Sequence, residues 1–331
     1  MHTLLSKSLL LCAVALGLNA TAPATAHADQ LVSPSLIKST ERGVFLNGRY
    51  YVGGQHGIHE VKRTADSSPH CKIDTGSGFT VCLLVSTVYG ADQCDYSGMT
   101  ADNTYLYAAC TVADKTAAIP LLAPPKRAAL FRVKPAATSS TAAEVVSKPF
   151  ATPVWYNGMT VLDNNTLLMT PSAPLGTKSA IVKLRITNTL TLDHTITEWL
   201  PGSPLYLLNN GVTVNNGHVY FVGGQNLWRI AVKSDGSAGL PILLYQTTIN
   251  QTLDDLTVKG DWVVAAEIGI VNGLGLNSLT FVHKTGLGPT FKLWTGLTQL
   301  SGVVVDPGTF GTPGAFIATS YFQGGVYRYF Y

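Results

Sequence analysis

One short phrase recurs six times between residue 41 and the end of the chain, and it constrains the fold more than any other feature. Each copy has a polar residue, usually followed by glycine, then apolar residues, a tight turn and a second apolar run. The residues that open the copies are Arg42, Ser97, Asn157, Asn210, Asp254 and Ser301. Successive copies start 44 to 60 residues apart, close to the length of a propeller blade.

Each copy can be divided into four short strands. Asn47-Gly48 in the first copy and Asn215-Asn216-Gly217 in the fourth are typical of hairpin turns. Third strands, such as 129–134 and 181–186, alternate apolar with basic or polar residues, as a half-covered strand requires. We therefore predict an all-β protein, a six-bladed β-propeller with four-stranded blades.

The sixth copy ends directly after its third strand. We expect the N-terminal segment around Leu31 to Ile37 to supply the missing strand, because closing the ring in this way leaves no open sheet edge. A linear stack of repeats is the alternative, and it would need capping units. The prediction makes residues 29–331 a single propeller domain.

Residues 1–28 have the features of a secretory signal peptide. Lys7 is followed by an apolar run, and Ala26-His27-Ala28 is a small-x-small cleavage site. A retained membrane anchor is the alternative, but the apolar run is short for spanning a bilayer. We expect a secreted or periplasmic protein that has no membrane anchoring after cleavage.

Four cysteines remain after cleavage, which is an even number in an exported chain. We expect the disulfides Cys71–Cys82 and Cys94–Cys110, although four thiols allow three connectivities and the cysteines could also be free and buried. No Cys-x-x-Cys spacing indicates zinc. Charged residues make up only 12% of the chain and its formal net charge is +3, which does not indicate nucleic-acid binding.

The six opening residues should surround the axial channel of the propeller. Carboxylate and amide oxygens that converge in this way suit Ca²⁺ or another divalent metal. We expect Asn157, Asn210 and Asp254 to be ligands, together with Glu41 beside Arg42. The alternative is a hydrated channel without metal, in which the polar residues only satisfy backbone groups. The long loops 111–127, 171–179 and 267–277 should lie on the same face as these residues.

This pattern resembles the SMP-30/gluconolactonase family and its paraoxonase-like and strictosidine-synthase-like relatives. In the gluconolactonases a Glu opening the first blade, an Asn-Gly opening the fourth and an Asp-Gly opening the fifth hold a divalent metal, and a further Asn lies on the third. Asn157, Asn210 and Asp254 match in the same order. The chain departs from the family at Arg42, where the Glu would fall, and at Asp255, where the family has glycine.

The resemblance implies a metal-dependent lactonase or esterase that hydrolyses a small lactone or ester, with Asp254 or Asp255 activating water as the general base. The alternative is a non-catalytic propeller. It would bind a ligand, glycan or protein through the loop-rich face, and its metal would be structural only.

Overall fold

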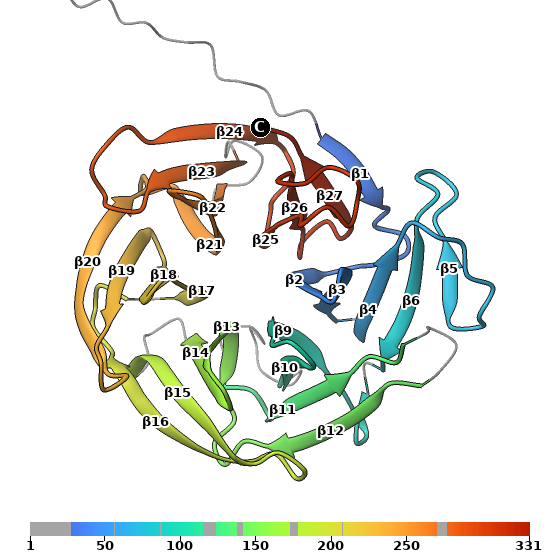
Figure 1. Cartoon of the computed structure of the whole chain (residues 1–331), viewed down its shortest axis with the longest axis horizontal. Coiled ribbons are helices and arrows are strands. Elements are labelled where there is room, and N and C mark those ends of the chain that lie inside the picture. Colours follow the sequence, from blue (N-terminus) through green and yellow to red (C-terminus); the bar gives the residue numbers. More distant parts are fainter. Residues whose placement is uncertain are drawn as a thin grey trace, which may run out of the picture.

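The computed structural model describes residues 28–331 except 56, 87, 115–123, 138–141, 173–177, 207 and 270–276. Six antiparallel sheets are arranged around a central axis (Figure 1). The predicted all-β, six-bladed propeller is therefore confirmed. Residues 1–27 of the expected export signal and the tips of the three long loops lie outside the described residues.

Each blade runs outward from the axis in chain order. Blade one contains β2 (Thr40–Leu46), β3 (Arg49–Gly54), β4 (Gly57–Lys62) and β6 (Thr80–Val85), with an additional outer strand β5 (Cys71–Ile73). Blade two contains β9 (Asp95–Ala101), β10 (Leu106–Val112), β11 (Arg127–Lys134) and β12 (Glu144–Pro149). A small hairpin of β7 (Val88–Tyr89) and β8 (Asp92–Gln93) lies between them.

The remaining blades follow the same order. Blade three contains β13 (Trp155–Asp163), β14 (Thr166–Ser172), β15 (Ser179–Asn188) and β16 (Asp193–Pro201). Blade four contains β17 (Asn209–Asn215), β18 (His218–Gly223), β19 (Asn226–Val232) and β20 (Ala238–Gln246). Blade five contains β21 (Gln251–Lys259), β22 (Trp262–Gly269), β23 (Asn277–His283) and β24 (Phe291–Gly296). Blade six contains β25 (Gly302–Val305), β26 (Phe316–Thr319) and β27 (Val326–Tyr329).

Blade six is completed by β1 (Ala28–Val32), which pairs antiparallel with β27. Ala28 lies opposite Tyr329, and Figure 1 shows the first and last strands side by side. The ring therefore closes with an N-terminal strand as expected, but that strand is 28–32 rather than a segment around Leu31 to Ile37. Residues 33–39 instead connect β1 to blade one.

The apolar core lies between the blades rather than inside any one of them. Six buried clusters alternate around the ring, one at each junction of neighbouring blades. Between blades one and two, for example, Tyr51 and Met99 pack beside Tyr96 and Phe131. The two faces of each blade pack against the two neighbouring blades, and a single blade therefore has no core of its own.

Both expected disulfides are present. Cys71–Cys82 links β5 to β6 across directly paired positions, with Cα atoms 4.0 Å apart. Cys94–Cys110 joins the residue before β9 to β10, with Cα atoms 5.5 Å apart. Two disulfides fit an oxidising, extracytoplasmic environment. Across the described part of the chain, no helix has the length and apolar character needed to cross a membrane.

Candidate functional site

The innermost strand of five blades carries a one-residue β-bulge at its polar residue. In blade one, Thr40 and Arg42 face adjacent residues of β3, so Glu41 is the extra residue. Asn157 is the extra residue in blade three. In blade five, Asp254 and Asp255 together face one residue of β22. Because a bulge changes the direction of a side chain, these positions aim polar groups at the axis.

The bulges also correct the alignment of the first blade. Ser301 Oγ donates a hydrogen bond of 2.7 Å to Thr40 O, and Ser97 Oγ donates one of 3.0 Å to Tyr156 O. Thr40 therefore corresponds to Tyr156, and Glu41 corresponds to Asn157. The residue that opens blade one is Glu41, and Arg42 occupies the next position, which is glycine in blades two, three, four and six.

The glycine of the repeated phrase is required by the neighbouring blade. A Cβ added at Gly98 would lie 2.6 Å from Tyr156 O of blade three, and one at Gly211 would lie 2.7 Å from Asp255 Cα of blade five. At Gly158 the added atom would overlap Asn210 O. In these three blades the innermost strands thus approach the next blade too closely for a side chain at this position.

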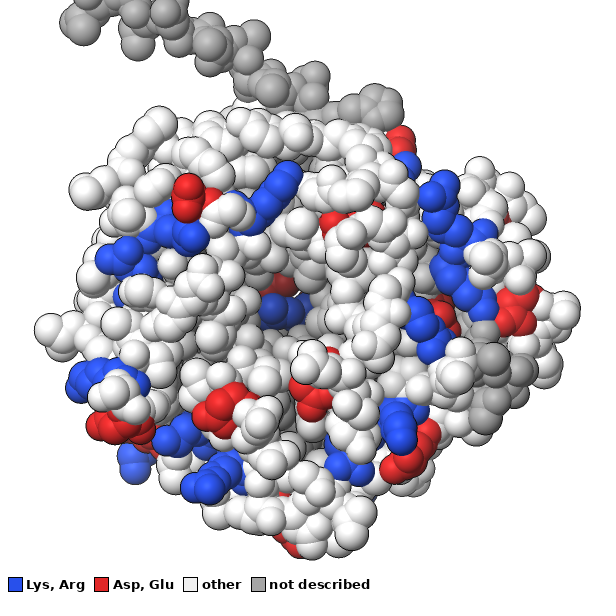
Figure 2. Space-filling view, viewed as in Figure 1, with Lys and Arg blue, Asp and Glu red and all other residues white. Residues whose placement is uncertain are grey.

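Two blades break this glycine rule, and their side chains meet. Arg42 Nη1 of blade one lies 3.0 Å from Asp255 Oδ1 of blade five, and both side chains are buried. Arg42 Nη2 also donates to Val212 O at 3.3 Å, while Val303 N donates to Asp255 Oδ2 at 3.1 Å. The ion pair therefore connects four blades across the channel. Figure 2 shows basic and acidic atoms within the hollow at the centre of the molecule.

A cavity of about 290 Å³ lies at the axis, and the expected ligands line it together. Glu41, Asn157, Asn210 and Asp254 reach it from blades one, three, four and five, with Ser97 from blade two. Asp255 does not line this cavity, because its carboxylate is engaged by Arg42 and Val303 one residue further along β21. Asn210 Nδ2 donates a hydrogen bond to Asp254 Oδ1.

A second set of lining residues lies two positions before the bulges. These residues are Asp95, Trp155, Leu208 and Thr252. Because side chains along a strand alternate in direction, a residue two positions earlier faces the same side and lies nearer the mouth of the channel. Asp95 was missed by the sequence analysis, which considered only the residues of the repeated phrase. The period of two places Asp95 on the same side of β9 as Ser97, but only the assembled ring shows that both reach the shared cavity.

The carboxylates in this cavity are not neutralised by the described side chains that line it, none of which is Lys or Arg. Glu41 Oε2 and Asp95 Oδ1 are buried, and neither accepts a hydrogen bond within the described structure. Burial raises the pKa of Glu41 well above its usual range, and the charges of Asp254 and Asp95 raise it further. Burial also raises the pKa of Asp254, with a further increase from Asp255, and raises that of Asp95 to about 6.

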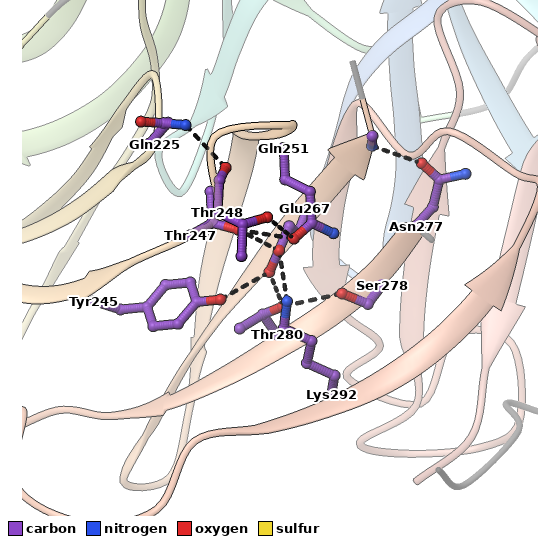
Figure 3. A network of polar contacts seen from close by, with 11 residues as sticks. Gln225, Tyr245, Thr247, Thr248, Gln251, Glu267, Asn277, Ser278, Thr280 and Lys292 are labelled. Atoms are coloured by element: carbon purple, nitrogen blue, oxygen red, sulfur yellow. Dashed lines mark hydrogen bonds and ion pairs between the residues drawn. The ribbon is translucent and has the colours of Figure 1, made fainter. Parts of the chain in front are cut away.

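Another buried carboxylate in the same protein shows how such a group is normally accommodated. Glu267 of β22 is fully buried between blades four and five. Its oxygens accept hydrogen bonds from Thr247, from Thr280 at 2.5 Å and from Tyr245 at 3.2 Å, and Lys292 Nζ lies 2.6 Å from Oε1 (Figure 3). Glu267 thus has a cation and several donors, whereas Glu41 and Asp95 each retain an unpartnered oxygen.

The axial residues therefore fit a divalent cation. Oxygen donors from two carboxylates and two amides, completed by water, are the ligands that Ca²⁺ prefers. The only cluster of three potential acidic, histidine or cysteine ligands within 4.8 Å of one another among the described residues is Asp66 with Cys71 and Cys82, whose thiols form a disulfide. Glu41, Asp95 and Asp254 are thus spread too widely for all three to ligate a single ion in this arrangement.

Comparison with known proteins shows the fold and no family. The chain matches no protein-family model and no curated protein. The calcium structure of a family AA12 carbohydrate-active enzyme from Trichoderma reesei has a TM-score of 0.58 at 11% identity, covering 92% of this chain and 95% of that one. A glucose-dehydrogenase-type oxidoreductase from Thermus thermophilus has a TM-score of 0.54 at 14% identity, covering 92% and 100%. The PQQ domain of a pyranose dehydrogenase from Coprinopsis cinerea has a TM-score of 0.54 at 8% identity, covering 92% and 95%.

Proposed function

We propose that the axial cavity binds Ca²⁺ or a similar divalent cation and that the protein hydrolyses a small lactone or ester there. The observation that carries this proposal is the meeting of Glu41, Asn157, Asn210 and Asp254 in one cavity from four different blades. Bound there, a divalent cation would polarise the substrate carbonyl and stabilise the oxyanion that forms on it.

The other residues of the cavity suit a substrate with an apolar part. Four apolar side chains line the same cavity as the acid cluster of Glu41, Asp95 and Asp254, namely Trp155, Leu208, Ile268 and Phe322. Phe322 is 62% exposed. These apolar side chains would hold the non-reacting part of a lactone or ester next to the proposed metal ligands. An acidic cavity whose described lining residues include no Lys or Arg suits PQQ poorly, because PQQ itself carries carboxylates. This argues against carrying over the cofactor named for one of the structural neighbours.

The test is hydrolysis of a panel of lactones and esters, with and without chelator. We expect turnover that is lost on chelation and restored by Ca²⁺. Asp254→Ala should abolish both the turnover and the increase in melting temperature that Ca²⁺ causes in the wild type. Asp163→Ala is a matched control, because Asp163 is an exposed carboxylate at the β13–β14 turn.

A binding module with a structural metal is the second candidate. It is favoured by exposed apolar side chains around the same face, including Leu205, Ile249, Leu297 and Phe322, which lie in loops that share this face by strand direction. If Ca²⁺ stabilises the protein while no substrate is turned over, this candidate replaces the hydrolase.

A further inference from the structure

We propose that Asp95 is the general base of this site; the inference rests on the proposed hydrolase function. In the proposed site Asp254 would bind the ion, and it accepts a hydrogen bond from Asn210, whereas Asp255 pairs with Arg42. With these roles assigned, we look for the base that accepts the proton of an attacking water among the other carboxylates. Among the described residues that line the cavity, Asp95 is the remaining carboxylate besides Glu41, and it enters from blade two.

The position of Asp95 is fixed by covalent and hydrogen bonds around it. Asp95 lies at the start of β9, directly after Cys94, which is bonded to Cys110 of the paired strand β10. Tyr321 of blade six donates its hydroxyl proton to Asp95 Oδ2 at 3.1 Å. Gln55 Nε2 of blade one donates to the Tyr321 oxygen at 2.5 Å. Because Tyr321 accepts from Gln55, its own proton is directed to Asp95.

These contacts leave one oxygen of Asp95 for chemistry. Oδ2 is held by Tyr321, while Oδ1 is buried and accepts no hydrogen bond from the described residues. Burial and the neighbouring Asp95 raise the pKa of Tyr321, so the phenol remains protonated and continues to donate. A carboxylate with one oxygen fixed and the other unpartnered beside a substrate cavity is arranged to receive a proton.

The reaction balances without any oxidant or reductant. Asp95 Oδ1 accepts a proton from water while the water oxygen forms a bond to the carbonyl carbon. The bond between that carbon and the ester oxygen then breaks, and the leaving oxygen takes the proton back from Asp95. A lactone gives one hydroxy acid, whereas an ester gives an acid and an alcohol. Asp95 ends the cycle as a carboxylate.

Tyr321 acts through Asp95 and is therefore a positioning residue. Replacing it by Phe removes one hydrogen bond to a charged group, and we expect kcat to fall about tenfold with KM unchanged. Asp95→Asn removes the base while keeping the size of the side chain. We expect it to lower kcat by at least about 100-fold, and Asp95→Glu to retain more activity than Asp95→Asn.

The experiment measures two quantities for wild type, Asp95→Asn, Asp95→Glu and Tyr321→Phe, with Asp163→Asn as the exposed control. These are kcat on the best substrate of the panel and the increase in melting temperature caused by Ca²⁺ alone. Loss of kcat in Asp95→Asn with the Ca²⁺ effect retained supports the base. Loss of the Ca²⁺ effect would make Asp95 a ligand and overturn the proposal.

Two other results would also overturn it, and they can be told apart. If wild type hydrolyses a substrate and Asp95→Asn stays within about threefold of it, the base assignment is wrong and the hydrolase stands. If wild type hydrolyses nothing on the panel, with or without Ca²⁺, the hydrolase and its base are both rejected.

Discussion

At the scale of single residues, the axial channel has three levels that differ in charge. Asp95, Trp155, Leu208 and Thr252 lie at the mouth, and the bulge residues Glu41, Asn157, Asn210 and Asp254 follow. The buried ion pair of Arg42 and Asp255, the floor pair, lies one residue further along β2 and β21. The floor pair balances one positive with one negative charge. Among the bulge residues, the negative charges of Glu41 and Asp254 are not balanced by a lining Lys or Arg in the described structure, and this suits a bound cation.

The floor pair gives a first prediction about stability. Arg42→Met would leave Asp255 buried without its cation, and we expect the free energy of unfolding to fall by about 3–5 kcal/mol. Adding Asp255→Asn should recover most of that loss, because the uncompensated charge is then gone. Denaturant unfolding of the two single variants and the double variant measures this coupling. A double variant with strictly additive losses would contradict it.

The acid cluster predicts an unusual pH dependence in the metal-free protein. Asp95 has a pKa of about 6 when folded because of burial, and its ordinary value is 3.8. Between these values the folded protein holds a proton that the unfolded chain has lost. Stability therefore falls as pH rises from about 4 to 6, by about 3 kcal/mol from this group, and changes no further above that range. Glu41 and Asp254 shift in the same direction.

Thermal unfolding in the presence of chelator, from about pH 4 to 7, measures this loss. With Ca²⁺ added the decline should disappear or reverse, because ligand binding favours the ionised carboxylates. Asp95→Asn should flatten the chelator curve. An unchanged slope in that variant would show that the pKa of Asp95 is not raised.

At the scale of strands, the glycine that follows the bulge in blades two, three and four sets how closely these blades pack against the next. Gly158→Ala places a Cβ against Asn210 O of the next blade. We expect a loss of about 1–3 kcal/mol in the free energy of unfolding and weaker Ca²⁺ binding, since Asn210 must move. Gly76→Ala is the control, because there an added Cβ would meet only the Asp74 Oδ1 atom at 3.3 Å. Equal stability of the two variants would contradict the close approach.

The same glycine explains what the sequence could and could not reveal about the site. The six-fold phrase predicted the blades and brought out Asn157, Asn210 and Asp254, because each of them is the polar residue at the start of a copy. In blade one the pattern was misaligned by one residue, since Gly43 follows Arg42 and makes it resemble the other opening residues. Asp95 was missed because its importance depends on strand alternation into a shared cavity, and only the assembled ring shows which alternate positions converge.

At the scale of the whole molecule, closure by β1 determines whether the ring is one cooperative unit. Leu31 and Val32 are almost completely buried and pack between blades six and one. Removing residues 28–32 would expose the edge of β27 as well as this apolar surface. We expect a loss of several kcal/mol, from about 1.5–3 kcal/mol for each buried side chain, together with self-association through the free edge.

Size-exclusion chromatography and thermal unfolding of the 33–331 chain test this expectation. Gln30→Ala in the full chain is the control, because Gln30 is exposed in the same strand. A truncated chain that remains monomeric and equally stable would show that β1 is dispensable.

The pairing of Ala28 with Tyr329 has a consequence for how the protein is made. During synthesis β1 is made before the other strands of the ring, whereas its partner β27 is made only with blade six. Until blade six is made, β1 has no partner strand to pair with. A chain that is released before blade six is made would therefore form an open ring. Such a ring would expose the unpaired edge of β1, which cellular quality control could recognise.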